Sequence, residues 1–229
     1  MSMRQFPRAW MMSLCLVATA ASALSLADLS NQDASNGLKA ALEKGSLAAV
    51  AKLGVENGFL NNDKVKIGLP GPLEKARPLL KMTGRGQQLD DLVVAMNHAA
   101  EAAVPLAKPM LLDAVRSMSV TDAKNILTGG DTSVTDFFRA KTAPQLTVKF
   151  LPVVKKVTDR SDLSAKYNGV MRQAGPLGVG GQQATVEDYV TQRALDGLFT
   201  MIGEEEKAIR RDPIGSGSKI IGKVFGALR

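Results

Sequence analysis

Two long segments of this sequence space their apolar residues three and four positions apart, which is the period of one face of an α-helix. They cover about residues 88–117 and 186–211. Thr185 and Asp188 stand at the spacing of an N-terminal cap for the second segment, and Pro213 prevents that helix from continuing. The chain is therefore expected to fold around long helices, and the fold class predicted for it is all-α.

Shorter segments show the same period, and we expect helices over residues 30–44, 46–57, 72–82, 133–141, 144–158 and 162–174. Gly45 is predicted to separate the first two into an N-terminal helical hairpin. Pro105 and Pro109 predict a kink or break near Val104 in the long segment, because each proline removes a backbone donor and crowds the preceding turn. Residues 175–184 contain four glycines and a proline, and we expect a loop there.

One stretch departs from the helical period. It alternates four apolar side chains with polar residues, namely Phe59, Val65, Ile67 and Leu69. A period of two is typical of a strand, but a single strand would have no partner in this chain. We therefore expect an extended arm over about residues 58–72 that lays its apolar residues across the helices. The pattern as a whole predicts one multi-helix domain over residues 24–214, followed by a Gly-Ser spacer and a short amphipathic tail over residues 215–229.

The start of the chain has the three parts of a secretory signal peptide. Arg4 and Arg8 give a positive beginning, residues 9–21 are apolar, and Ala21-Ser22-Ala23 places small residues before a cut. A membrane-spanning helix needs about 20 residues, and this apolar run is shorter. We therefore expect residues 1–23 to be cleaved and the protein to reside in the periplasm. Cleavage would also remove Cys15, the only thiol.

The net charge is +7, and the basic residues are unevenly distributed. Residues 139–172 contain eight basic side chains against Asp159 and Asp162. We interpret this stretch as a solvated helix face, with anionic lipid, a polyanion or an acidic partner as alternatives. Nucleic acid is not expected as a partner, because the stretch has few aromatic side chains to stack bases. The tail is expected to dock on the protein body, with weak contact to a membrane surface as the alternative.

The residue types that carry most enzyme chemistry are scarce. After cleavage the chain would offer one histidine, His98, and no cysteine, whereas zinc and other transition-metal sites recruit several of these ligands. The sequence contains no Gly-x-Ser-x-Gly nucleophile elbow and no phosphate-binding glycine loop followed by Lys-Ser/Thr. No metal and no cofactor are therefore expected, and no catalytic set is assigned.

Asn97 and Glu101 form the most notable polar pair, because they lie one helical turn apart within a stripe of alanines that should be buried. If buried, both need hydrogen-bond partners, for which we consider Lys108, Arg139, Thr191 and Asp196. A carboxylate in an apolar setting could act as a general acid or base, which makes Glu101 the one catalytic candidate. Alternatively, Glu101 belongs to a structural salt bridge. The candidates for binding a ligand or partner are Asn97, Glu101, Thr191 and Asp196.

Several short motifs resemble a bacterial family known as domain of unknown function 4197. They are Leu29-Ser30-Asn31, Asn57-Gly58-Phe59-Leu60, Asn97 with Ala99-Ala100-Glu101, and Tyr189-Val190-Thr191 followed by Ala194-Leu195-Asp196-Gly197-Leu198-Phe199 and Glu204-Glu205. The resemblance implies an exported, helical, single-domain protein of Gram-negative bacteria, and it brings no established activity or ligand. The sequence departs from the family pattern at His98, where an arginine is expected, and at residues 215–218.

Three functions are consistent with these observations. The first is an exported, non-catalytic protein that binds a partner or supports the envelope. The second is a carrier or sensor of a small apolar or amphiphilic ligand, held in a cavity between the helices. The third is a hydrolase-type enzyme that uses Glu101.

Overall fold

The computed structural model describes residues 31–130, 132–160 and 185–212, together with residues 164, 165, 168, 215, 221 and 224. The predicted signal peptide and the predicted loop over residues 175–184 lie outside these residues, as does most of the predicted helix over residues 162–174. The described elements are all helices: α1 (Asn31–Leu53), α2 (Gly71–Met82), α3 (Gly86–Ala103), the short 3₁₀-helix η2 (Val104–Leu106), α4 (Ala107–Arg116), α5 (Val120–Thr128), α6 (Ser133–Thr158) and α8 (Val186–Arg211). The predicted all-α fold is thus confirmed.

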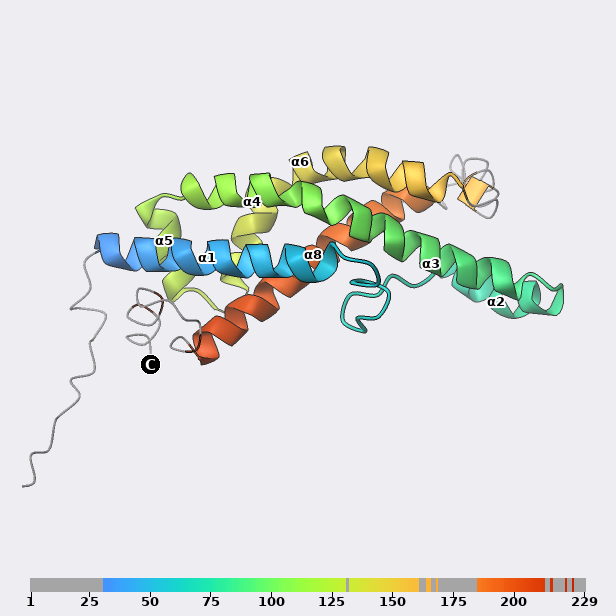
Figure 1. Ribbon diagram of the computed structural model, residues 1–229, viewed down its shortest axis with the longest axis horizontal. Coiled ribbons are helices and arrows are strands. Elements are labelled where there is room, and N and C mark those ends of the chain that lie inside the picture. Colours follow the sequence, from blue (N-terminus) through green and yellow to red (C-terminus); the bar gives the residue numbers. More distant parts are fainter. Residues whose placement is uncertain are drawn as a thin grey trace, which may run out of the picture.

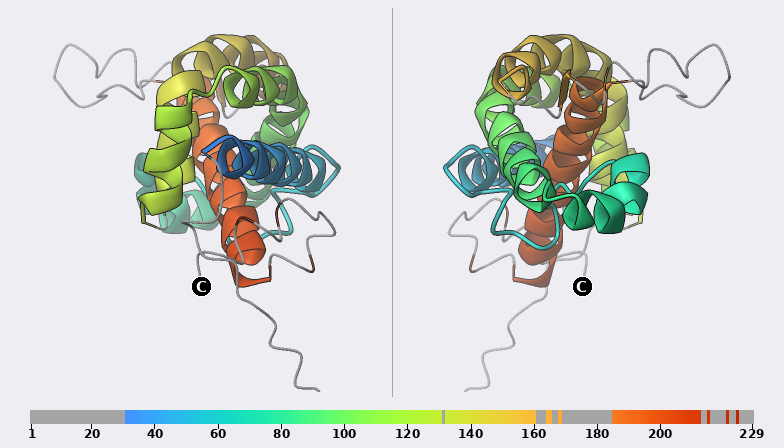
Figure 2. Two further views of the ribbon diagram at one scale, coloured as in Figure 1. Left: turned by 90° about the vertical axis from the view of Figure 1, so that its left-hand side faces the viewer. Right: turned by 90° about the vertical axis from the view of Figure 1, so that its right-hand side faces the viewer.

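Helix α8 runs through the middle of the molecule. Figure 2 shows it surrounded by α1, α6 and the line of α3 and α4, and Figure 1 shows α2 and the start of α3 at the opposite end from α5. Fifteen of the 26 residues of α8 are buried, far more than one face of a surface helix would bury. Thr185 caps this helix by accepting a hydrogen bond from the Asp188 amide at 3.1 Å, as its spacing predicts.

The predicted N-terminal hairpin is wrong, because α1 continues through Gly45 as a single helix. This glycine faces α8, where a Cβ atom would lie 3.4 Å from the Cβ of Glu205. It therefore allows the two helices to approach closely instead of ending a helix. Glycine costs a helix about 1 kcal/mol relative to alanine, and the packing of α1 on α8 outweighs that cost.

The helices predicted over residues 133–141 and 144–158 are likewise one helix, α6, with Pro144 and Pro152 inside it. Buried residues recur at every fourth position through the first proline, at Val134, Phe138, Thr142, Leu146, Phe150, Val154 and Thr158. This unbroken stripe packs against α3 and α8. The burial of so many side chains along one line keeps the helix continuous although Pro144 lacks a backbone donor.

The break predicted near Val104 is confirmed. Helix α3 ends at Ala103, Val104 and Pro105 belong to the 3₁₀ turn η2, and α4 begins at Ala107. Pro109 falls in the first turn of α4, where a backbone N–H has no intrahelical acceptor and its loss is tolerated.

Two residues of the predicted tail lie in the protein core. Ile221 and Val224 are buried, with 1% and 0% of their surface exposed. Among the residues that the structure describes, no helix combines the length and apolar character required to cross a membrane.

Candidate functional site

The α1–α2 loop, residues 54–70, contains the predicted arm. The arm is extended only from Lys66 to Pro70, because residues 56–65 form successive turns and Gly71 already begins α2. The expectation of an extended arm over residues 58–72 is therefore corrected. Its four apolar residues are nevertheless buried across the helices, as expected: Phe59, Val65, Ile67 and Leu69.

Glu101 of α3 holds the first half of this loop. Its side chain is 6% exposed, and its carboxylate accepts three hydrogen bonds from backbone N–H groups. The amide of Asn57 donates to Oε2 at 3.1 Å, and the amides of Phe59 and Leu60 donate to Oε1 at 3.0 and 3.2 Å. Charge-assisted hydrogen bonds of this kind are stronger than neutral ones. The carboxylate thus satisfies a turn whose amides would otherwise be unpaired on burial.

Asn97, one turn earlier on α3, holds the second half of the loop. Its Oδ1 accepts from the amide of Ile67, and its Nδ2 donates to the carbonyl of the same residue, both at 2.9 Å. Nδ2 also donates to the carbonyl of Val93 at 2.7 Å. The side-chain amide pairs with Ile67 as a neighbouring strand would, which explains how a single extended segment is satisfied without a sheet.

Helix α8 closes the loop from the other side. The Tyr189 hydroxyl donates to the carbonyl of Gly68 at 3.2 Å. Gly197 leaves room for the ring of Phe59, because a Cβ atom there would lie 2.6 Å from the Phe59 Cε1 atom. The irregular loop is therefore fixed between two helices rather than free on the surface.

The partners predicted for Asn97 and Glu101 are thus wrong: the donors are loop amides, not other side chains. Asp196 instead forms an ion pair with Arg139 at 3.0 Å, and the guanidinium of Arg139 also lies 4.9 Å from the centre of the Phe199 ring. Thr191 is 2% exposed, and its hydroxyl has no hydrogen-bond partner among the described residues. Lys108 is exposed on α4. The structure brings together Asn97 and Glu101 under the loop, whereas Asp196 pairs with Arg139 and the Thr191 hydroxyl forms no hydrogen bond with a described residue.

His98 lies beside this pair at the surface of α3. Its side chain is 40% exposed, and Nε2 lies 3.9 Å from the Glu101 Oε2 atom. Nε2 has no hydrogen-bond partner among the described residues. The imidazole is therefore close to the carboxylate without being hydrogen-bonded to it.

A polar groove of about 370 Å³ lies between the second half of the loop and α8. Its polar lining comes from Lys64, Lys66, Tyr189, Arg193, Asp196 and Thr200. Lys64 is hydrogen-bonded to Glu204, which lowers the pKa of that carboxyl below its ordinary value. Among the residues that line this groove, the sequence predicts only Asp196 as a site residue, because the alternation of lysines with apolar residues in the loop indicates an arm and not one wall of a groove.

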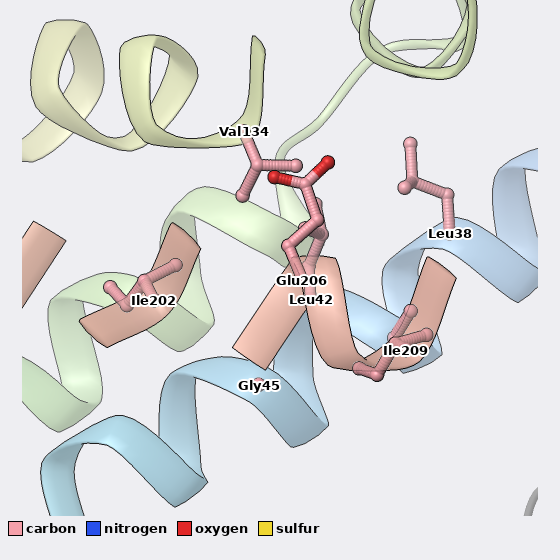
Figure 3. Close-up of a pocket in the computed structure, with 8 residues that line it drawn as sticks. Leu38, Leu42, Gly45, Val134, Ile202, Glu206 and Ile209 are labelled. Carbon is pink, nitrogen blue, oxygen red and sulfur yellow. The ribbon is translucent and has the colours of Figure 1, made fainter. Parts of the chain in front are cut away.

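An apolar pocket between α1, α6 and α8 is far too small for an amphiphilic ligand. Figure 3 shows it lined by Leu38, Leu42, Val134, Ile202 and Ile209, with the carboxylate of Glu206 beside Val134. Its free space is about 10 Å³, which is the size of a single water. Glu206 is bound by Arg210 at 2.7 Å across one helical turn. This pocket gives no support to the carrier hypothesis.

The described residues contain no group of three or more His, Cys, Asp or Glu side chains that could hold a metal ion.

Comparison with known proteins identifies the family. Residues 28–226 match the model of a family described as protein of unknown function (DUF4197). The chain belongs to this family. No curated protein and no solved structure matches it.

Proposed function

We propose that this protein is exported to the periplasm and acts there without catalysis, by binding a partner at the face formed by the α1–α2 loop and α8. The observation that carries the proposal is the use of Glu101. Both of its oxygens are occupied by backbone amides of the loop, so the strongest candidate for acid-base chemistry serves to fix a surface.

A loop held in this way is suited to recognition. Binding residues are often placed on loops that a rigid scaffold positions, and a pre-ordered surface loses little conformational entropy when a partner binds. Here Asn97 and Glu101 order the loop from behind, and the loop then presents Lys66 towards the groove. Arg193 lies across the groove from the loop, with its guanidinium 5.3 Å from the centre of the Tyr189 ring.

Site-specific photocrosslinking tests the partner. A photoreactive amino acid is placed at Lys66 or Thr200 on the groove, and at Lys124 on α5 as an exposed control. We expect one reproducible crosslinked band from both groove positions and none from the control. Equal crosslinking at all three positions, or at none, would contradict binding at this face.

Export has its own test, so that the two halves of the proposal can fail separately. The chain is expressed in a Gram-negative bacterium and recovered by osmotic shock, and its N-terminus is sequenced. We expect the mature protein to begin at Leu24 and to appear in the periplasmic fraction. Full-length protein that stays in the cytosol would contradict export, whatever the crosslinking shows.

A further inference from the structure

The joined ends of α2 and α3 form a convex end of the molecule, which we call the hairpin tip and define as residues 75–88. In Figure 1 it lies at the right-hand end, beyond the crossing of α1 and α8. Helix α2 packs on α3, with Leu73 buried in the first turn of α2, at the base of the hairpin, and Leu89 buried in the first turn of α3. The tip itself contributes little to the core.

Two large apolar side chains are exposed at this tip. Leu79 is 65% exposed and Met82 is 85% exposed, the latter the highest value among the exposed large hydrophobic residues of the described chain. They stand three residues apart near the end of α2, so they lie on the same face of the helix. The tip therefore presents adjacent apolar side chains to the surroundings.

The charged residues within the tip are all basic, and acidic residues flank them in the sequence. Residues 75–88 contain Lys75, Arg77, Lys81 and Arg85 and no acidic residue. Arg77 is paired with Glu74 and Asp90, whereas the other three are exposed and form no ion pair with any described residue. Three exposed basic residues thus lie within four positions of Leu79 or Met82 along the chain.

The turn at the tip is built into the backbone. Gly84 has a φ of 75°, the amide of Arg85 donates to the carbonyl of Leu80 at 2.8 Å, and the amide of Gly84 donates to that of Lys81 at 3.1 Å. These are the two hydrogen bonds of a Schellman motif, which ends a helix with a glycine in the left-handed region. The shape of the tip exists without a ligand.

We propose that the hairpin tip docks on the surface of a bilayer that contains anionic phospholipid. Apolar side chains next to lysine and arginine are the combination by which peripheral proteins bind such surfaces, the first entering the interface and the second attracted by the lipid phosphates. A convex tip fits a plane. It is also small for a stable protein interface, since fourteen residues fall short of the about 20–30 that each partner contributes. The site is separate from the groove, and it does not depend on the function proposed above.

Vesicle sedimentation tests this with vesicles of phosphatidylcholine alone or of phosphatidylcholine mixed with phosphatidylglycerol. Wild-type and variant proteins are purified identically, so that the N-terminal segment and the tail contribute equally to the vesicle binding of each protein. The wild type is expected to bind the mixed vesicles, and Leu79→Ser/Met82→Ser or Lys81→Glu/Arg85→Glu is expected to bind them about tenfold more weakly.

Matched control variants on α6 distinguish binding through the tip from general electrostatic attraction between a basic protein and an anionic vesicle. Val148→Ser removes another exposed apolar side chain, 74% exposed, and Lys149→Glu/Lys156→Glu changes the net charge as much as the tip variant does. Both controls are expected to bind within about twofold of the wild type, since a tip contact would hold α6 away from the surface. The proposal is overturned if the α6 charge variant loses as much binding as the tip variant, or if phosphatidylcholine alone binds equally well.

A fluorescent probe reports insertion directly. In a chain with Cys15→Ser, an environment-sensitive dye is attached to Met82→Cys or, as a control, to Val148→Cys. The emission of the dye at the tip is expected to shift to the blue with mixed vesicles only, while the control stays unchanged. The alternative result is a dimer in sedimentation equilibrium that Leu79→Ser/Met82→Ser dissociates, together with no emission shift of the dye on addition of vesicles. In that case the tip binds a second copy of the chain, and the lipid proposal is wrong.

Discussion

The α1–α2 loop and the hairpin tip are neighbours in the chain, yet they are stabilised in opposite ways. The loop has an irregular backbone, and the apolar residues that it lays across the helices are buried, namely Phe59, Val65, Ile67 and Leu69. Its amides and carbonyls find partners on α3 and α8, through Glu101, Asn97 and Tyr189. The tip has a helical backbone that satisfies its own hydrogen bonds, and it exposes Leu79 and Met82.

The difference shows what irregular structure requires. A loop can be buried only if other elements supply polar side chains for its backbone, since an unpaired buried amide is costly. At a helix end, the backbone groups are paired within the helix and its capping turn. Such an end can therefore protrude without polar side chains from other elements. In this protein the buried side chains of Asn97 and Glu101 supply partners to the loop backbone, and substitutions there should cost far more than substitutions at the tip.

The largest effect is expected from Glu101→Leu, which removes the acceptor of three loop amides. Leaving them buried and unpaired should lower the free energy of unfolding by about 4 kcal/mol, at about 1–3 kcal/mol for each unsatisfied group with partial relaxation. Urea denaturation followed by circular dichroism measures the change. Glu101→Gln is the matched control, because its remaining oxygen can still accept from Phe59 and Leu60, and it should lose about half as much. A loss below about 1 kcal/mol for Glu101→Leu would contradict the role assigned to this carboxylate.

The second-largest effect is expected from Asn97→Ala. This change should lower the free energy of unfolding by about 3 kcal/mol, because both backbone groups of Ile67 would lose their partner. Hydrogen exchange should show faster exchange of the Ile67 amide, while the amides of Phe59 and Leu60 stay protected by Glu101. Asn125→Ala on the exposed face of α5 serves as the control and should change stability by less than about 0.5 kcal/mol. Uniform loss of protection along the whole loop would mean that the two halves are not held separately.

Gly197→Ala tests the contact between the loop and α8. The new methyl group would meet the Phe59 ring at 2.6 Å, and such overpacking costs about 2 kcal/mol. Gly68→Ala, at a loop position with no atom within 4 Å of the added carbon, should stay within about 0.5 kcal/mol of the wild type. Thermal melts of the two variants compare them directly. Equal stability would show that Phe59 can move without cost, and hence that the loop is less fixed than its contacts indicate.

A buried polar group without a partner should behave in the opposite way from Glu101. The Thr191 hydroxyl on α8 has no partner among the described residues, so Thr191→Val should raise the free energy of unfolding by about 1 kcal/mol. Thr142→Val is the matched control, since this equally buried hydroxyl donates to the Phe138 carbonyl at 2.7 Å. The free energy of unfolding of Thr142→Val should fall by about 1 kcal/mol or stay unchanged. Destabilisation by Thr191→Val would reveal a partner for that hydroxyl.

The sequence predicts the helices well wherever the apolar period is uninterrupted, as in α2 and α8. It fails at Gly45 and Pro144, because local propensity suggests a stop and the packing of α1 and α6 against α8 overrides it. Within the site, Asn97 and Glu101 are detectable as polar residues in an alanine stripe. Their partners are not, since a backbone amide carries no residue-specific signal. The groove also escapes prediction, because the loop and α8 are far apart in the chain.

The smallest effect is expected at the hairpin tip, and it completes the comparison. Leu79→Ser and Met82→Ser remove side chains that are already mostly in water, so each should change the free energy of unfolding by less than about 0.5 kcal/mol. Leu73→Ser at the base of the same helix is the matched control. This side chain is 8% exposed, and its loss should cost about 2 kcal/mol or more. If the tip variants are as stable as the wild type, folding does not require apolar residues there, as the proposed lipid contact expects. If they are instead destabilised like Leu73→Ser, the tip belongs to the core in solution, and both the contrast with the loop and the proposed lipid contact are wrong.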